Sequence, residues 1–225
     1  MSKEQKEKKS KNDGKSRFSN LKWIIVAILT IIFILLWLGT TTGLTDRIDD
    51  FIYKNVEGMR SNFLTVVLIG ITELGGIIGL FLVLLVTVIV LCKKNKTKEA
   101  AAITLNLVIS TITYVILKNI FQRQRPTTGN ILIDEVGFSF PSGHTTNNVA
   151  FYFLAIYLVC INVKNKKIRN LSCIILAIIP CIIAFSRIYL RVHYPTDVIA
   201  GFCLGIVLVI LFTTFIWPRI ERSKE

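Results

Sequence analysis

The sequence predicts an all-α integral membrane protein, a bundle of six transmembrane helices with both ends of the chain on the same side of the membrane. Two observations lead to this fold class. The 225 residues are 52% hydrophobic and have a mean hydropathy of +0.60, more than a soluble domain of this length requires. The apolar residues also gather in long runs, and a helix needs about 20 of them to cross a bilayer.

The chain begins with a basic segment, residues 1–20, in which lysine dominates and Ser, Asn and Gly lie between. This composition cannot bury enough apolar surface to fold alone, so we expect a disordered tail. Trp23–Leu38 is then almost wholly apolar. A cleaved signal peptide is the alternative, but the run is long for one and residues 37–40 lack a small-residue cleavage pattern. We therefore expect an uncleaved signal-anchor helix.

Residues 39–217 contain the other five expected crossings. The polar segment 40–62 is expected to form a loop or an interfacial helix. Phe63–Cys92 is too long for one straight span and is interrupted by Glu73 and several glycines. We expect it to enter the membrane up to about Leu74 and then to cross over Ile77–Leu91. Apolar runs of spanning length predict the remaining four crossings, at Ala100–Leu117, Val149–Val163, Leu171–Phe185 and Val198–Trp217.

The formal net charge of +13 is concentrated on one face of this bundle. The tail up to Lys22, the loops 93–98 and 164–169 and the C-terminal segment carry 19 of the 27 lysines and arginines. The positive-inside rule makes this face cytoplasmic, where the charge meets anionic lipid headgroups, and no nucleic acid is needed to explain it. The chain thus divides into a basic cytoplasmic tail, a transmembrane domain and a short cytoplasmic tail, at residues 1–20, 21–218 and 219–225.

Three polar clusters lie at the edges of apolar runs on the opposite, outer face. The first contains Lys118 and Arg125, which are seven residues apart and point along one helix face if the helix continues to Pro126. Two aligned cations suit an anion. Taken alone, a pair of side chains that reach from the helix to the membrane interface is the simpler explanation.

The second cluster, Pro141-Ser142-Gly143-His144, opens the fourth span. Pro, Ser and Gly at a helix start leave backbone N–H groups at the positive end of the helix dipole, an arrangement that binds phosphate well. Gly143 would let the ligand approach the backbone, Ser142 adds a hydroxyl donor, and His144 would donate a proton. An ordinary helix cap with an interfacial histidine is an equal alternative.

The third cluster runs from Ser186 to Asp197 and holds one of only two histidines in the chain. Arg187 lies at the end of the fifth span, and Pro195 begins the sixth. If Asp197 accepts the Nδ1 proton of His193, it fixes the tautomer and leaves Nε2 as a nucleophile. An aspartate in the first turn of a helix is also a routine feature, so this pair alone does not decide the function.

Together the clusters resemble the three signature motifs of the type 2 phosphatidic acid phosphatase (PAP2) superfamily. The matching residues are Lys118-x6-Arg125-Pro126, Pro141-Ser142-Gly143-His144 and Ser186-Arg187-x5-His193-x3-Asp197. They occur in the family's order and without a substituted position. The resemblance covers residues 118–197 directly, and the six-span layout extends it to nearly the whole chain. It implies a PAP2/haloperoxidase-like helical core.

The resemblance also implies a membrane lipid phosphatase that acts outside the cytoplasm through a phosphohistidine. His193 would attack phosphorus, oriented by Asp197, and His144 would protonate the leaving oxygen. The groups that would bind the phosphoryl oxygens are Lys118, Arg125, Ser142, Gly143 and Arg187. We expect no metal and no other cofactor, because fixed cations supply the charge and both histidines are already used.

The motifs bind the phosphate and leave the identity of the lipid open. Among the substrates of the family, undecaprenyl pyrophosphate suits an outer site best, phosphatidylglycerophosphate comes second, and phosphatidate is a further alternative. A phosphotransferase, which passes the phosphoryl group to an acceptor, and a non-catalytic membrane protein with an anion site are the rival functions. Glu73 and Arg191 receive no role from the sequence.

Overall fold

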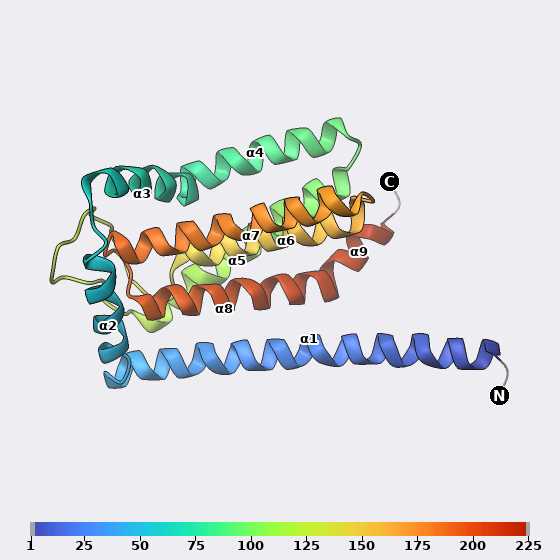
Figure 1. Ribbon diagram of the computed structural model, residues 1–225, viewed down its shortest axis with the longest axis horizontal. Coiled ribbons are helices and arrows are strands. Elements are labelled where there is room, and N and C mark those ends of the chain that lie inside the picture. Colours follow the sequence, from blue (N-terminus) through green and yellow to red (C-terminus); the bar gives the residue numbers. More distant parts are fainter. Residues whose placement is uncertain (1–2, 224–225) are drawn as a thin grey trace.

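The computed structural model describes residues 3–223, with side chains from Asn20 onward, and this part of the chain is all-helical, without a strand (Figure 1). Five of its helices are long and apolar enough to span a membrane, and there are six spans if the bent pair of helices is counted as one. Each expected crossing falls on one of these elements. The predicted all-α membrane bundle is confirmed.

The helices keep the order that the apolar runs predicted. Their bounds are α1 (Lys3–Thr42), α2 (Asp46–Glu57), α3 (Asn62–Gly75), α4 (Ile77–Lys93), α5 (Thr97–Phe121), α6 (Gly143–Asn162), α7 (Lys166–Tyr189), α8 (Pro195–Leu211), the π-helical turn η1 (Phe212–Ile216) and α9 (Trp217–Arg222). The pair α3 and α4 bends by 58° at Gly76, between the entering and crossing parts that the sequence predicted. The short helix α2 occupies the segment expected to be interfacial.

The long helices lie side by side along one direction, and α2 crosses one end of the bundle (Figure 1). α6 packs against α5, α7 and α8, while α1 packs on α8 and α4 on α5. The loop 122–142, which joins α5 to α6, lies at the same end as α2. This end of the bundle is therefore the one where all three polar clusters lie.

The four basic segments lie at the other end, with the start of α1 and with α9 (Figure 1). Lys98 Nζ donates to the carbonyl of Ser223 (2.8 Å), and Lys22 Nζ donates to the hydroxyl of Thr214 (3.3 Å). The two ends of the bundle thus differ in charge as the sequence predicted. Which membrane face each end meets stays a prediction from the positive-inside rule.

α1 includes most of the basic segment for which the sequence predicts a disordered tail. α1 begins at Lys3, inside the basic segment, and continues without a break into the first span. Lysine, glutamate and glutamine are good helix formers, and the apolar turns that follow supply the nucleus that an isolated segment would have to form by itself. The helix therefore extends backward from the span. Residues 1–2 and 224–225 lie outside the described range.

Small residues bring α8 close to α6. Gly201 and Gly205 are four residues apart and face the same neighbour. A Cβ at Gly201 would lie 2.8 Å from the carbonyl oxygen of Ser142, and one at Gly205 would lie 2.7 Å from the side chain of Val149. Any larger side chain would push the helices apart, as at other close helix contacts in membranes. The first turn of α8 is thereby held against the start of α6.

The outside of the bundle is apolar, whereas polar side chains join the helices inside. Ile24, Phe81 and Ile175 are among many large apolar residues that are more than half exposed, which lipid tails accept and water would not. In the interior, the amide of Asn106 on α5 donates to the carbonyl of Ala150 on α6 (2.9 Å). Such bonds replace the hydrophobic driving force that lipid removes.

Candidate active site

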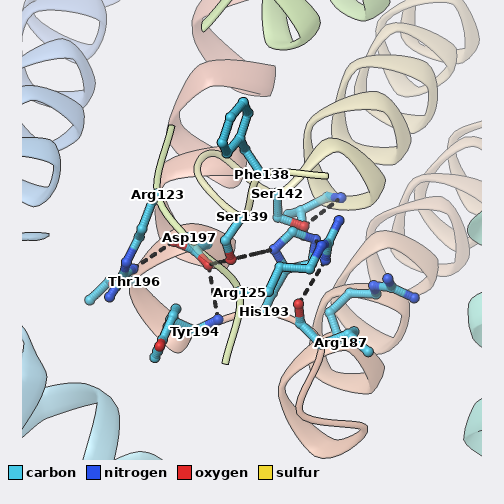
Figure 2. Close-up of polar contacts among 12 residues, drawn as sticks. Arg123, Arg125, Phe138, Ser139, Ser142, Arg187, His193, Tyr194, Thr196 and Asp197 are labelled. Carbon is cyan, nitrogen blue, oxygen red and sulfur yellow. Dashed lines mark hydrogen bonds and ion pairs between the residues drawn. The ribbon is translucent and has the colours of Figure 1, made fainter. Parts of the chain in front are cut away.

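The three clusters meet where α5 ends, α6 begins, α7 ends and α8 begins. Because these four helix ends lie at one end of the bundle, residues far apart in the sequence become neighbours. Figure 2 shows several of them around one centre. The structure brings together all the site residues that the sequence predicted, namely Lys118, Arg125, Ser142, Gly143, His144, Arg187, His193 and Asp197.

Arg125 reaches this centre from a loop and not from a helix, which corrects the sequence prediction. α5 ends at Phe121 because Gln122 adopts a left-handed conformation with φ of 51°. The chain then folds over the end of the bundle. Arg125 Nε and Nη2 donate to the carbonyls of Gly137 and Val136 (3.0 and 3.3 Å), so the loop itself fixes the guanidinium.

His193 is almost completely buried, and its two ring nitrogens face different partners. Nδ1 lies 3.5 Å from Asp197 Oδ2 and 3.3 Å from Ser139 Oγ, on one side of the ring (Figure 2). Nε2 lies 3.2 Å from Arg125 Nη1. The hydroxyl of Tyr53, on α2, donates to the backbone carbonyl of His193 (2.8 Å). These contacts direct Nε2 toward the cations.

Asp197 is fully buried, and several donors hold its carboxylate. Oδ2 accepts from the hydroxyl of Ser139 and from the N–H of Tyr194 (2.9 Å), which closes the first turn of α8. Oδ1 accepts from Arg123 Nη1 (2.6 Å), and Arg123 Nη2 binds Asp49 Oδ2 on α2 (2.9 Å). The orientation of His193 is thus fixed through Asp197 by the loop 122–142 and, through Arg123, by α2.

The start of α6 has the geometry that its sequence predicted. Ser142 is the N-cap, and its hydroxyl oxygen accepts from the N–H of Thr145 (3.4 Å). The Ser142 N–H donates to the backbone carbonyl of Asp197 (3.0 Å), which joins the second cluster to the third. Gly143 lies directly against an aromatic ring, because a Cβ there would be 2.6 Å from Tyr114.

Arg187 and Lys118 are held from behind by neutral oxygens. Arg187 is 1% exposed, and its Nη1 donates to Thr72 Oγ1 on α3 (2.6 Å). Lys118 Nζ donates to the carbonyl of Phe138 (2.6 Å) in the loop between α5 and α6. With each cation tied to one fixed acceptor, its remaining donors are preorganised for an anion.

The centre of the site is occupied by the carboxylate of Glu135, from the same loop. Glu135 Oε2 lies 2.7 Å from Arg125 Nη1, forms an ion pair with Arg187 and lies 3.8 Å from His193 Nε2. Oε1 lies 3.6 Å from His144 Nδ1. Burial alone raises the pKa of Glu135, but Arg187 and the two histidines outweigh it and lower the pKa to about 2. Glu135 is therefore an anion in a pocket of cationic groups.

The electrostatic field of the site also acts on His193. Burial lowers the pKa of His193 well below its ordinary value, and the cations Lys118, Arg125 and Arg187 lower it further. An imidazole with a depressed pKa is neutral at physiological pH and keeps its lone pair. Such a ring can act as a nucleophile.

Comparison with known proteins now decides the family. Residues 99–221, more than half of the chain, match the PAP2 superfamily. The chain belongs to the PAP2 superfamily. Phosphatidylglycerophosphatase B of Bacillus subtilis (strain 168) is 32% identical over 200 residues, which cover 88% of this chain and 97% of that protein. The resemblance read from the three motifs is confirmed.

Two solved structures show the same fold. One is the crystal structure of a transmembrane PAP2 type phosphatidylglycerolphosphate phosphatase from Bacillus subtilis, with a TM-score of 0.79, 30% identity, and coverage of 88% of this chain and 98% of that one. The other is LpxE of Aquifex aeolicus, with a TM-score of 0.59, 24% identity, and coverage of 73% and 93%. This protein is thus a membrane phosphatase of the PAP2 superfamily.

Four positions around the PAP2 site were not found from the sequence. Glu135 and Ser139 lie in the loop that the motifs skip, and Asp49 is in α2, far from every motif. Arg123 lies between the motif residues Lys118 and Arg125, so its charge could have marked it as a candidate site residue. Asp49 also accepts from the N–H and the hydroxyl of Thr196 (2.9 and 2.8 Å), which ties α2 to the start of α8.

The two residues without a predicted role lie outside the centre. Arg191 stacks its guanidinium over the ring of Tyr53 (4.3 Å) and has a φ of 59°, so it packs the turn before α8 against α2. Glu73 is exposed at the end of α3, near the bend. Among the described residues, no three His, Cys, Asp or Glu side chains form a group able to hold a metal ion.

An apolar cavity of about 440 Å³ adjoins the site on the side of His144. It lies between the bend of α3 and α4 and the facing sides of α5 and α6, and Phe81 and Leu107 are among its lining residues. Gly76 brings the bend close to the histidine, because a Cβ there would lie 3.4 Å from His144 Nε2. The polar centre and the apolar cavity therefore share the side chain of His144.

Proposed function

We propose that this PAP2 phosphatase removes a terminal phosphate from a lipid through a phosphohistidine formed on His193. One observation carries the proposal: two arginines and both histidines of the protein lie within 4 Å of a single carboxylate, that of Glu135. A carboxylate in that position stands in for the anionic phosphoryl group. The same donors would bind the phosphoryl oxygens of a substrate.

In the first step, His193 Nε2 attacks phosphorus. The P–N bond forms while the bond from phosphorus to the lipid oxygen breaks, and His144 gives its proton to that oxygen. Asp197 and Ser139 hold the Nδ1 side of the ring and stabilise the positive charge that develops there. Arg125 and the other cations balance the charge on the phosphoryl oxygens.

In the second step, water attacks the phosphohistidine. His144, now neutral, takes a proton from the water as the P–N bond breaks, and inorganic phosphate and neutral His193 result. No metal enters either step, since Lys118, Arg125 and Arg187 supply the charge. Ser142 and the backbone at Gly143 complete the phosphoryl site at the positive end of α6.

The site is proposed to face the outside of the cell membrane. Both ends of the described chain and the basic loops lie at the opposite end of the bundle, which the positive-inside rule assigns to the cytoplasm. The basic residues there would contact anionic lipid headgroups. Asp46 and Glu57, at the two ends of α2, would instead lie on the outer side, with the site.

The apolar cavity beside His144 supports a lipid as the leaving group, because the proton donor lies at its border. We propose phosphatidylglycerophosphate as the first substrate, since the relative that matches over almost its whole length is a phosphatidylglycerophosphatase. The outer location favours undecaprenyl pyrophosphate, but none of the relatives reported above is named for that lipid. It stays the second candidate.

The experiment is phosphate release in detergent from phosphatidylglycerophosphate, undecaprenyl pyrophosphate and phosphatidate, with EDTA present. We expect the first to give the highest kcat/KM, and His193→Ala to release none while vanadate still raises its melting temperature. A rapid acid quench with ³²P-labelled substrate should label the wild-type chain and leave His193→Ala unlabelled. An active His193→Ala variant, or release that depends on an added acceptor, would contradict the mechanism.

A further inference from the structure

The position of Glu135 bears on which lipids can enter the site. Its carboxylate touches the two arginines that would bind the phosphoryl oxygens, and Oε2 lies on the Nε2 side of His193, at 3.8 Å. A substrate phosphoryl group needs this same place. It therefore enters only when Glu135 leaves.

We propose that Glu135 is an internal competitor, a carboxylate that occupies the phosphoryl site and lowers its occupancy by singly charged phosphodiester headgroups and by the product phosphate. The inference rests on the proposed function, because it takes the groups around Glu135 as the phosphoryl site. It adds a competitor that belongs to the chain itself.

The residues on either side of Glu135 have little contact with the bundle. Asp134 and Val136 are exposed, and the side chain of Val136 is 94% exposed, although Leu132 and Ile133 before them pack against the bundle. Residues 135–137 are held by the two bonds from Arg125 to the backbone of residues 136 and 137 and by the ion pairs of Glu135. A competing anion thus has few contacts to break.

An internal competitor lowers the apparent affinity of every anion by the same factor, the fraction of molecules in which the site is vacant. A phosphate monoester carries a charge of about −1.5 to −2 and three terminal oxygens, and it retains useful affinity after this loss. A phosphodiester carries a single charge and has two free oxygens. Its weaker affinity, lowered further by this factor, is too low for these headgroups to fill the site even at their concentration in the bilayer.

This competition matters because the site opens at the membrane edge. Bulk phospholipids are phosphodiesters, and they surround the bundle at concentrations far above those of any phosphate monoester lipid. The apolar cavity that suits the substrate's chains suits theirs as well. Without Glu135, the exposed cationic groups would hold these headgroups as unreactive ligands, since their phosphorus is not a terminal phosphoryl group.

The test compares Glu135→Gln with Asp134→Asn, a matched loss of one negative charge at the next residue of the same loop. Among the described contacts, Asp134 forms no ion pair with the site, so this variant controls for general charge effects. Three quantities are measured in detergent. They are the KM for phosphatidylglycerophosphate, the inhibition constant of inorganic phosphate, and inhibition by phosphatidylglycerol at increasing mole fraction in mixed micelles.

For Glu135→Gln we expect the KM and the inhibition constant of phosphate to fall together, by roughly tenfold, since two charge-assisted contacts no longer compete. Phosphatidylglycerol should inhibit this variant and not the wild type or Asp134→Asn. The rise in melting temperature that inorganic phosphate produces should also be larger for Glu135→Gln, a readout that does not depend on turnover.

Equal constants in Glu135→Gln and Asp134→Asn would overturn the inference, and so would a higher KM in Glu135→Gln, which would make the carboxylate part of substrate binding. If Glu135→Gln unfolds, Glu135→Ala is measured in its place under the same criteria. A wild-type protein that releases phosphate from no lipid would instead refute the proposed function. The phosphate-dependent melting shift of the variants would then still decide whether Glu135 competes for the site.

Discussion

Arg123 gives the sharpest test of how His193, the proposed nucleophile, is held. Its guanidinium joins two carboxylates that are almost fully buried, Asp197 at 2.6 Å and Asp49 at 2.9 Å, and stacks on the ring of Tyr194 at 3.8 Å. Arg123→Met keeps much of the side-chain volume but leaves the buried carboxylates of Asp49 and Asp197 without their cationic partner. Removal of one partner from a buried ion pair costs about 3–5 kcal/mol. We therefore expect the variant's melting temperature in detergent to fall by roughly 10 °C.

A second substitution separates this explanation from simple loss of packing. Asp49→Asn in the wild-type background removes a partner of Arg123 and should lower the melting temperature. In the Arg123→Met background the same change removes a stranded charge and should raise it. This reversal of sign is the expected result of a double-mutant cycle, because the two residues share one interaction. Additive effects of the two substitutions would refute the network.

The activity of Arg123→Met should fall less than its contact with Asp197 suggests. Oδ2 of Asp197 keeps its bonds from Ser139 and from the Tyr194 N–H, so the carboxylate still faces His193. A loss of roughly 10–100-fold in kcat is expected, typical of a group that orients a catalytic residue from behind. An unchanged kcat would show that Oδ2 alone positions the ring.

Three further predictions concern the centre of the site. His193 should stay neutral as the pH falls through 6.5, because its pKa is depressed. The chain has only two histidines, so ¹⁵N NMR should show two imidazole signals, and His144→Gln identifies which of them belongs to His193. A charged His193 ring at pH 6.5 would contradict the depressed pKa. Because the unfolded chain takes up that proton near pH 6.5 and the folded chain does not, stability should also decline below this pH. Phosphate release should persist in EDTA without added divalent ions, and an absolute requirement for magnesium would overturn the proposed mechanism. Gly143→Ala should lose activity because the new Cβ lies 2.6 Å from the ring of Tyr114. Adding Tyr114→Leu removes that ring and should restore part of the activity. A double variant as inactive as Gly143→Ala would show that the clash with Tyr114 is not the cause.

Much of this arrangement was predictable because helices that cross a membrane alternate in direction. Lys118, His144 and Arg187 each lie where an apolar run meets a polar segment, and the count of crossings puts these three boundaries on one side. Spacing then predicted that Asp197 would lie near His193. These inferences depend on periodicity and chain direction, which local sequence determines.

The remaining features depend on tertiary contacts that local sequence does not reveal. Pro126 suggested that the helix would carry Arg125, but Gln122 ends it earlier in a left-handed conformation for which no glycine gave a signal. Asp49 binds Arg123 across 74 positions of the chain, and nothing in either segment indicates the other. Glu135 belongs to a loop without periodicity, so only its place in the fold shows that it reaches the centre.

The close contact between α6 and α8 has a consequence for how the enzyme tolerates change. His144 is carried by one of these helices and His193 precedes the other, so the gap between the proposed acid and the proposed nucleophile is an interhelical distance. Gly201 and Gly205 fix that distance from within the bilayer, without touching a substrate. Two glycines thus set the distance between the two histidines. A mutational screen for loss of activity should therefore find both glycines, although neither touches the substrate.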